Sequence, residues 1–487
     1  MNQDDIEADI AVVGAGLAGL TAACRAAEAG CRVVVLEAGE AEAYACNTRI
    51  ATGVLNMAHA DPLSGEPALR KAIADDTEGY ADPVLADLLA RTAGPALEWL
   101  RASGARAIRV MVQGSPVWML APPRLPQTGH EWQGYGADLV MKALVEKLLK
   151  QGSTIEYGIR ARRLRMENGA CVGLDAERGG AAVRLAARQV VLADGGFQGN
   201  VELVRRFISP RPECLAQRSA GTGRGDALVM AEEAGARLTE ADCFYGHLHC
   251  QDAINNALLW PYPTMDTLVG GCIMVDHQGR RFADEGLGGV TLANVLARLE
   301  DPLSATAIFD QNIWESSGRV ERVAPNPHLV QSGGTLITAP DLPSLARALD
   351  RPERTLVETV TAYNAAIDSG SGHALVPPRT AGRAFGVSRA APERVKLFPI
   401  ATPPFHAVRL CAGISFTMGG IEIDAQARVL SREGEPLPGL LAAGSCTGGI
   451  EGGPIAGYIG GLMKAACLGL VAGDTAARAC SDHDKGD

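Results

Sequence analysis

The fold of this chain is decided by residues 9–20, which read Asp9-Ile10-Ala11-Val12-Val13-Gly14-Ala15-Gly16-Leu17-Ala18-Gly19-Leu20. An apolar run ends at the first of three glycines, and small residues then recur at helical spacing until Gly30. A second apolar run over residues 32–36 ends at Glu37. These patterns predict a strand, a helix and a second strand within about thirty residues.

The three glycines of this turn serve different purposes. Gly14 allows the tight turn, Gly16 lets the backbone approach a pyrophosphate, and Gly19 lets the helix pack closely on the strand. The helix N-terminus offers free N–H groups, and Glu37 can accept hydrogen bonds from ribose hydroxyls. The combination predicts a dinucleotide-binding unit; a merely tight strand–helix turn is the alternative.

Composition and charge indicate which partners and which cellular compartment to expect. The chain has 487 residues with a formal net charge of −11, which argues against nucleic acid and anionic membrane surfaces as partners. Its 12 cysteines include no C-x-x-C pair and suggest reduced thiols in the cytoplasm rather than disulfides. The first strand begins by Asp9, so no targeting segment is expected. The longest apolar stretch, residues 454–473, contains Lys464 and is expected to be a buried helix, with a membrane span as the alternative.

Glycine-rich strand ends indicate which dinucleotide is bound. Glycine makes up 57 residues of the 487, and 13 of these fall within residues 413–461. Two further strands are expected to end in glycines, at residues 192–196 and 440–444, and a helix opens at Gly457 to Gly461. Backbone without side chains at several strand ends would let a long cofactor pass close by. The N-terminus of the helix could also face the O2 atom of an isoalloxazine ring, so the pattern suits FAD better than NAD.

The rest of the chain divides into segments that differ in predicted secondary structure. Helices are expected over residues 84–101, 136–151, 226–236, 342–349 and 353–369, and hairpins between residues 155 and 191. Short strands are expected at residues 421–423, 428–430 and 440–443. We predict an α/β fold in which residues 1–241 and 406–487 form a Rossmann-like FAD-binding domain. Residues 242–405, which are punctuated by prolines, would be an inserted α+β capping domain.

Several motifs resemble one family in order and content. They are residues 47–53 (Asn-Thr-Arg-Ile-Ala-Thr-Gly), 192–197 (Leu-Ala-Asp-Gly-Gly-Phe), 225–226 (Gly-Asp), 279–285 (Gly-Arg-Arg-Phe-Ala-Asp-Glu), 417–420 (Thr-Met-Gly-Gly) and 439–449. The chain thereby resembles flavoproteins of the fumarate reductase/succinate dehydrogenase type. The resemblance implies an FAD domain interrupted by a mobile capping domain, with substrate held between cap and flavin.

The resemblance and the glycine motifs together predict the residues that hold FAD. These are Gly14, Gly16, Leu17, Ala18, Gly19, Glu37, Ala38, Asn47, Thr48, Arg49, Ala51, Thr52, Gly53, Ala161, Ala193, Asp194, Gly195, Asp226, Gly444, Ser445, Gly460, Gly461 and Leu462. Where membrane-bound members attach flavin through a histidine, this chain has Asn47, so non-covalent FAD is expected. No metal site is predicted.

Departures from the family pattern affect the expected chemistry. The resemblance implies a proton-transferring arginine where gapless counting brings Gly289, and a carboxylate-binding histidine where Phe416 stands. A further family arginine corresponds roughly to Ile455. With these three charged groups absent, fumarate reduction is not expected.

A partial resemblance to ketosteroid Δ1-dehydrogenases lies in Pro454-x-x-Gly457, whose backbone N–H would help polarise a substrate ketone. The tyrosine that precedes this proline in those enzymes is Gly453 here. Such enzymes remove an α-proton with a base while flavin accepts the β-hydride. The match is partial, so the base has to come from elsewhere in the chain.

Candidate catalytic side chains cluster at the entry to the predicted cap. Those near this entry are Tyr245, His247, His249 and Tyr262. Glu451, where the resemblance implies a histidine beside the flavin, and the backbone of Gly457 are further candidates in the second part of the FAD-binding domain. The two histidines share a strand face, and a carboxylate near a glycine-rich floor would have a perturbed pKa. Each also has a structural alternative: core-bonded histidines, a packing tyrosine, an acid at a helix start. Arg379 either binds a carboxylate or closes the domain interface.

We therefore predict an FAD-dependent oxidoreductase that acts on a CH–CH bond next to a carbonyl, as a desaturase of a small cyclic ketone or oxo-acid. The alternatives are an ene-type reductase of an α,β-unsaturated carbonyl or carboxylate, and a flavin-bearing binding protein without turnover. The expected partners are a small-molecule substrate and an unidentified electron acceptor or donor, because no second dinucleotide unit is present. The sequence leaves the substrate and the acceptor open.

Overall fold

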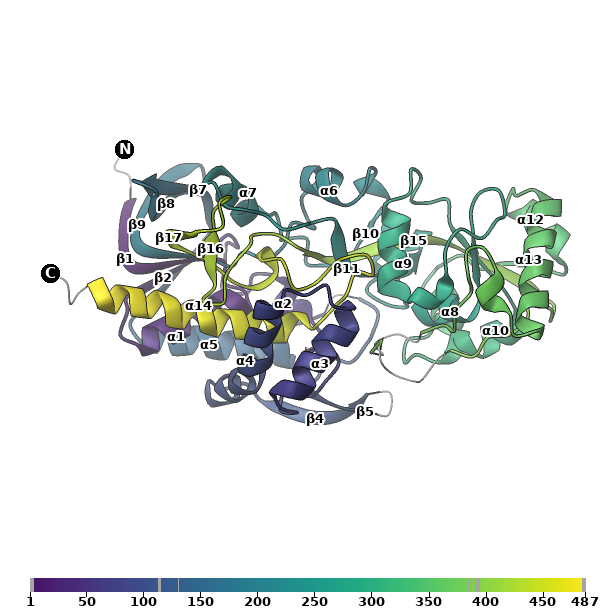
Figure 1. Ribbon diagram of the computed structural model, residues 1–487, viewed down its shortest axis with the longest axis horizontal. Coiled ribbons are helices and arrows are strands. Elements are labelled where there is room, and N and C mark those ends of the chain that lie inside the picture. The colour runs from purple at the N-terminus through teal and green to yellow at the C-terminus, as the bar shows by residue number, and fades with distance from the viewer. Residues whose placement is uncertain are drawn as a thin grey trace.

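The protein is elongated, with two sheets arranged along its length in a computed structural model (Figure 1). The structure describes residues 4–112, 115–129, 131–383, 386, 388–389 and 395–483. Strands β1 (Asp4–Val13) and β9 (Ala181–Leu192) lie at one end, and helices α12 (Leu342–Ala348) and α13 (Glu353–Asp368) lie at the other.

The first sheet is mainly parallel and contains the predicted strand–helix–strand unit. Its order is β16-β17-β9-β1-β2-β6, with β2 at Val33–Glu37, β6 at Thr154–Tyr157, β16 at Arg428–Leu430 and β17 at Pro436–Ala442. All neighbouring pairs are parallel except β16–β17. A hairpin of β7 (Ile159–Glu167) and β8 (Ala170–Arg178) extends the sheet from β9. The carboxyl ends of β1, β9 and β17 therefore meet at one edge, where α/β proteins bind ligands.

Helices cover this sheet. Helix α1 (Leu17–Glu28) packs against α5 (Gly136–Lys150) and against the C-terminal α14 (Gly461–His483), which also contacts α4 (Pro83–Ala102). The face of α1 is almost entirely buried, because alanines and leucines recur along it. Helix α2 (Asn47–Ile50) contacts α5, α3 (Glu66–Thr77) contacts α4, and α7 (Asp226–Glu233) contacts β7, while α6 (Val201–Phe207) follows β9 in the chain. A small antiparallel sheet contains β3 (Val54–Leu55), β4 (Ala107–Val112) and β5 (Ser115–Leu120).

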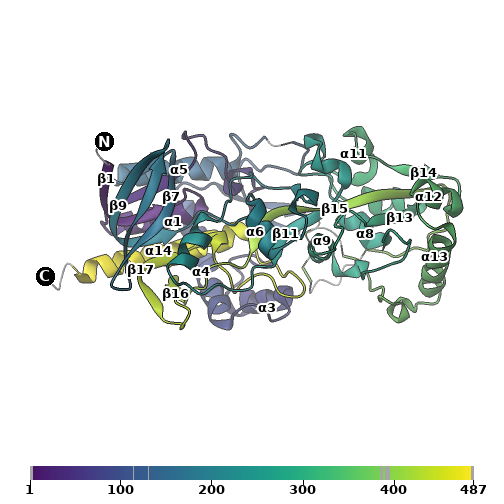
Figure 2. The same cartoon turned by 90° about the horizontal axis from the view of Figure 1, so that it is seen from above.

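The second sheet is built around β15 (Phe405–Met418), which runs lengthwise from the middle of the molecule toward α12 (Figure 2). It pairs with β10 (Ala216–Gln217), β11 (Cys243–Cys250), β13 (Thr306–Asp310) and β14 (Ile337–Ala339), and β12 (Ile273–Val275) pairs with β13. Helices α8 (Asp266–Gly271), α9 (Gly289–Ala297), α10 (Gln311–Glu315) and α11 (Pro325–Gln331) surround it, with 3-10 turns at residues 212–214, 251–254, 257–259, 285–287, 317–319, 372–374 and 444–446.

The predicted helices all form; several begin at the predicted residue, and the other ends are shifted by up to four residues. Two predictions need correction. Residues 421–423 make only isolated bridges, to Leu238, Val429 and Thr447, rather than a strand. The last helix begins at Gly461 and not at Gly457, because Gly457 closes a bridge with Gly452 and Gly460 has a φ of +116°, which no right-handed helix accepts. β15 also crosses the predicted boundary at residue 405, so both predicted parts contribute to the second sheet.

Candidate active site

The turn between β1 and α1 has the shape that the glycines predict. A Cβ at Gly14 would lie 2.7 Å from the Ala193 carbonyl oxygen, and one at Gly19 would lie 1.9 Å from the Gly14 oxygen. Gly16 is the N-cap of α1 and provides no side-chain cap to the helix. The first turn of α1 therefore faces the edge of the sheet with bare backbone, as a bound pyrophosphate requires.

The acid at the end of β2 lies beside this turn. Glu37 accepts hydrogen bonds from Ala15 N (3.0 Å) and, with its other oxygen, from Gly39 N (2.8 Å), and Ala38 lies between. Burial raises the pKa of Glu37, and these N–H donors oppose that rise. Thr48 Oγ1 accepts from Leu17 N at 3.1 Å, which ties α2 to the start of α1.

A second carboxyl group lies at the end of β9. One oxygen of Asp194 accepts from Ala227 N (2.9 Å), and its other oxygen is buried without a hydrogen-bond partner among the described residues. Burial raises the pKa of Asp194 to about 7. Asp226 lies near it and forms a two-bond pair with Arg160 at 2.7 and 2.8 Å.

This edge fits a dinucleotide such as FAD on two observations: a Cβ would fill the cradle at Gly14, and the buried Asp194 oxygen lacks a partner. Other predicted cofactor residues surround the same edge. Gly444 approaches Ala18, with Ser445 beside it; Gly460, Gly461 and Leu462 form the entry to α14; and Ala51, Thr52, Gly53, Ala161, Ala193 and Gly195 lie on or next to α2, β7 and β9. The structure brings these segments together.

Two predicted cofactor residues have protein partners of their own. Arg49 is buried, lies 3.2 Å from Asp138 of α5, and has its guanidinium 4.4 Å from the centre of the Tyr44 ring. Asn47 donates to Ser415 O (2.9 Å) and accepts from Ala220 N (3.0 Å). Asn47 thus joins α2 to the second sheet.

A cavity of about 80 Å³ lies where the two sheets meet. One wall carries His59, Asp76, Ala456 and Tyr458 from segments next to the first sheet. The other carries Tyr245, His247, Asp266, residues 287–291, Arg383, Gly386 and Arg389 from around the second sheet. Two of the predicted catalytic side chains, Tyr245 and His247, therefore face a shared space.

The strongest chemical feature of this cavity is a buried pair of His247 and Asp266. His247 Nδ1 lies 2.5 Å from Asp266 Oδ2, and both side chains are almost fully buried. The other oxygen of Asp266 accepts from Leu248 N at 2.9 Å. Burial lowers the pKa of His247, although the Asp266 charge works against this shift. A neutral imidazole, which this pKa shift favours, would donate Nδ1–H to Asp266 and keep Nε2 as its basic atom.

The space that Asp266 occupies is available only because residue 289 is glycine. A Cβ at Gly289 would lie 1.9 Å from Asp266 Cγ and 2.1 Å from both carboxylate oxygens. Gly289 is the position where the family resemblance implies an arginine. Here the carboxylate of α8 fills the place of a side chain from α9.

The opposite wall holds a second His–Asp pair, which the sequence reasoning missed. His59 Nε2 lies 3.9 Å from Asp76 Oδ2. Asp76 Oδ1 accepts from Ser388 Oγ (2.8 Å) and from Arg389 N (2.7 Å). Burial lowers the pKa of His59 and raises that of Asp76. Ala58 and His59 both have positive φ, at 49° and 59°, which places strained backbone at this wall.

Aromatic rings line the floor between the two pairs. Tyr245 stacks on Tyr458 with ring centres 4.1 Å apart and on Phe416 at 5.2 Å, and meets His247 edge-on at 5.0 Å. Tyr458 Oη accepts from Gly461 N at 3.2 Å, which leaves its hydroxyl proton to be donated elsewhere.

The other predicted catalytic residues lie outside the set that lines this cavity. His249 is fully buried on β11, where burial strongly lowers its pKa. Tyr262 is buried under the Arg218 guanidinium, 5.2 Å from the ring centre. Glu451 forms a buried ion pair with Lys464 of α14 and accepts from Ile459 N. The Gly457 N–H donates to the Gly452 carbonyl at 2.8 Å.

Arg379 lies in the interior around the second sheet. Its Nε is 3.4 Å from Glu285, and its other nitrogens donate to the carbonyls of Gly270, Cys272 and Thr380. All these partners lie within residues 242–405, so the contacts join segments of the predicted cap to one another and not the cap to the predicted FAD-binding domain. No sequence signal marked Asp266, His59, Asp76 or Arg218, because their roles depend on contacts between distant segments.

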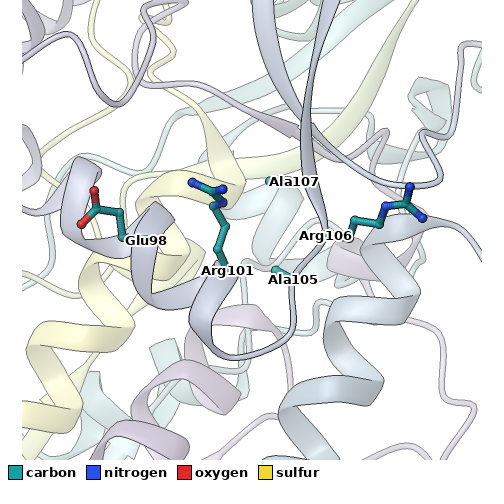
Figure 3. Close-up of a pocket in the computed structure, with 5 residues that line it drawn as sticks. All are labelled: Glu98, Arg101, Ala105, Arg106 and Ala107. Atoms are coloured by element: carbon teal, nitrogen blue, oxygen red, sulfur yellow. The ribbon is translucent and has the colours of Figure 1, made fainter.

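A larger hollow of about 570 Å³ lies away from this site, at the end of α4, lined by Glu98, Arg101, Ala105, Arg106 and Ala107. Figure 3 shows Arg101 and Arg106 pointing in different directions rather than toward a common ligand. Within the described ranges, no group of three or more His, Cys, Asp or Glu side chains has metal-binding geometry. No described helix is both long and apolar enough to cross a bilayer.

Comparisons with known proteins agree with this geometry. A family model described as an FAD binding domain matches residues 9–455. A fumarate reductase (cytochrome) of Shewanella frigidimarina is 27% identical over 486 residues, covering 96% of this chain and 77% of that protein. A 4-oxocyclohexanecarboxylate 2-dehydrogenase of Sinomonas cyclohexanicum is 28% identical over 365 residues, covering 72% and 60%. The fold is similar to 3-ketosteroid-Δ4-(5α)-dehydrogenase of Rhodococcus jostii RHA1, with a TM-score of 0.71 at 22% identity over 98% of each chain.

Proposed function

Because the chain belongs to the FAD-binding family of flavoprotein oxidoreductases, we propose that it desaturates a CH–CH bond next to a carbonyl in a small cyclic ketone or oxo-acid. The single observation that carries this proposal is the buried His247–Asp266 pair, which lines the cavity between the two sheets. The relative that acts on 4-oxocyclohexanecarboxylate supports the same substrate class.

His247 would serve as the base. FAD, held at the edge formed by β1, β9 and β17, would supply the two-electron oxidation by taking up the hydride from the carbon β to the carbonyl. His247 Nε2 takes the α-proton, and Asp266 holds the ring in the required tautomer and stabilises the imidazolium that forms. Leu248 N holds the second oxygen of Asp266, so the carboxylate keeps its place while the proton moves.

The carbonyl oxygen requires a hydrogen-bond donor as enolate character develops. Tyr458 lines the cavity, and its hydroxyl accepts from Gly461 N, so the phenolic proton is available to a ligand. Tyr245 stacks on it and lines the same cavity. We assign this polarising role to the two tyrosines and not to the Gly457 N–H, which the Gly452 carbonyl already accepts.

The protonation state of the pair favours the desaturating direction. An arginine is protonated at any physiological pH and suits proton donation to a reduced product. A histidine whose pKa is lowered by burial is neutral at pH 7 and suits proton removal. The replacement of an arginine at position 289 by the His247–Asp266 pair therefore supports a dehydrogenase over an ene-type reductase.

We further propose that FAD is held non-covalently, since Asn47 is bonded to Ser415 and Ala220 and carries no nucleophile. Residues 242–405 would act as the cap of a Rossmann-like domain formed by residues 1–241 and 406–487. All 12 cysteines are free thiols, which supports a reducing compartment such as the cytoplasm. The electron acceptor would be a separate molecule.

The test is anaerobic mixing of the FAD-bound protein with cyclohexanone, 4-oxocyclohexanecarboxylate and acyclic oxo-acids, followed by absorbance at the flavin band. Bleaching by a saturated ketone is expected. If no compound bleaches the flavin but enones reoxidise the dithionite-reduced protein, the ene-type reductase is the correct assignment. If neither half-reaction occurs, the protein is a flavin-bearing binding protein.

A further inference from the structure

Arg218 is a half-buried arginine near the site whose hydrogen-bond partners and ring contact among the described residues are all neutral. Its Nε donates to the Pro261 carbonyl (3.2 Å) and its Nη1 to Ser415 Oγ (3.0 Å), and its guanidinium lies over the Tyr262 ring. No carboxylate of a described residue lies within ion-pair distance of it. In contrast, Arg49, Arg160, Arg281 and Arg379 each have an Asp or Glu partner.

An irregularity in the second sheet positions this guanidinium. Residue 245 of β11 pairs with residue 416 of β15, while residue 246 pairs with residue 414, so Ser415 is an extra residue in a bulge. Bulges re-aim side chains and are frequent beside active sites. Here the bulge directs the Ser415 hydroxyl to Arg218, which follows β10 on the other side of β15.

The Arg218 charge reaches the groups that line the cavity. Burial raises the pKa of Tyr245 and Tyr458 and lowers that of His247, and in all three the positive charge of Arg218 acts to lower the pKa. Geometry links Arg218 to the cavity through the second sheet: its partner Ser415 precedes Phe416, whose ring stacks at 5.2 Å on Tyr245, and Tyr245 lines the cavity. Arg124 also lies nearby, but its guanidinium is not accessible to a ligand, because three of its nitrogens donate to backbone carbonyls and the residue is only 3% exposed.

We propose that Arg218, held by Ser415 and Tyr262, binds a carboxylate of the substrate, so that the substrate is an anionic cyclic oxo-acid rather than a neutral ketone. This rests on the proposed function for the reacting carbonyl. The Arg218 guanidinium is positively charged and has only neutral partners among the described residues. A substrate carboxylate would supply the opposite charge through a charge-assisted hydrogen bond. None of the three family positions that carry charge elsewhere supplies this contact here, since they are Gly289, Phe416 and Ile455.

The test measures binding without turnover. Cyclohexanecarboxylate, which has no ketone to activate, is titrated into the FAD-bound protein and followed by calorimetry. We expect R218Q to raise its Kd by about 10- to 100-fold, the usual worth of one charge-assisted contact, and R218K to lie between. The affinity for cyclohexanone should change less than about twofold. R237Q, which removes an arginine from an exposed ion pair with Glu422, is the matched control and should match the wild type.

The outcomes separate this inference from the proposed function. Equal Kd values for cyclohexanecarboxylate in the wild type and R218Q, or no binding to the wild type, overturn the carboxylate assignment even if cyclohexanone bleaches the flavin. A Kd that rises in R218Q, in a protein whose flavin no ketone bleaches, supports the anion site and removes the desaturase. Should R218Q fail to fold, R218K carries the comparison, because it keeps the charge and loses the planar contact with Ser415 and Pro261.

Discussion

Replacing Gly289 with alanine should disable the His–Asp pair without touching either member of it. A Cβ at this position would lie 1.9 Å from Asp266 Cγ, whereas carbon atoms in contact stay about 3.5–4.0 Å apart. The carboxylate must therefore retreat by about 1.6 Å or more. Such a shift lengthens the 2.5 Å contact between His247 Nδ1 and Asp266 Oδ2 beyond hydrogen-bond range. We expect the rate of flavin bleaching by substrate to fall about 100-fold, with about 1–3 kcal/mol lost in stability from overpacking.

The assay is anaerobic stopped-flow absorbance of the FAD-bound variant, with flavin content measured beforehand. Gly94→Ala on α4 is the control, because its Cβ would lie at an ordinary contact distance of 3.5 Å from the Pro62 carbonyl oxygen. Asp266→Ala and the double variant D266A/G289A should bleach at the same rate, since the clash disappears with the carboxylate. A G289A protein that bleaches at the wild-type rate would show that the carboxylate does not act through this position, and the reasoning would fail.

Four further results are expected. His247→Ala should slow bleaching by about 10²–10⁴-fold while His249→Ala does not. In the wild type the rate should rise with pH through a His247 pKa below the usual 6.5 and then level off, because the neutral imidazole is the base; an acidic limb centred above pH 7 would contradict this assignment. Glu451→Gln should lower the free energy of unfolding by about 3–5 kcal/mol in urea titrations, since it leaves Lys464 buried without its charge partner; a change below about 1 kcal/mol would refute that role. Gly14→Ala should purify with little flavin, judged by the ratio of flavin to protein absorbance, because its Cβ would meet the Ala193 carbonyl; full flavin content would count against the cradle.

The nucleotide-binding edge could be predicted from sequence because its information is local. Gly14, Gly16 and Gly19 lie within one turn, and Glu37 follows one strand later, so spacing alone determines how they meet. The same holds for the helices, whose apolar periodicity sets their extent. The start of α14 was misplaced because Gly460 has a backbone conformation that glycine permits and sequence does not reveal.

The chemistry of the cavity was only partly predictable for the opposite reason. His247 could be named from its place in the family pattern, but its partner Asp266 begins a short helix that carries no motif. Arg218 and Ser415 are separated by 197 positions, and the bulge that joins them appears only when β11 and β15 pair. Contacts of this kind depend on register between distant strands, which composition and spacing do not encode.

Position relative to the cavity distinguishes the proposed catalytic pair from a structural one. Both His247–Asp266 and Glu451–Lys464 are sealed from solvent, and removing charged groups from water is expensive enough that such pairs add little net stability. Glu451 and Lys464 lie outside the lining of the cavity, and they join the 451–459 turn to α14, so a structural role accounts for them. His247 and Asp266 line the cavity, and the lack of a side chain at Gly289 leaves the space that the Asp266 carboxylate occupies. A pair that adds little to stability and depends on a missing side chain is best explained by proton transfer to or from a ligand.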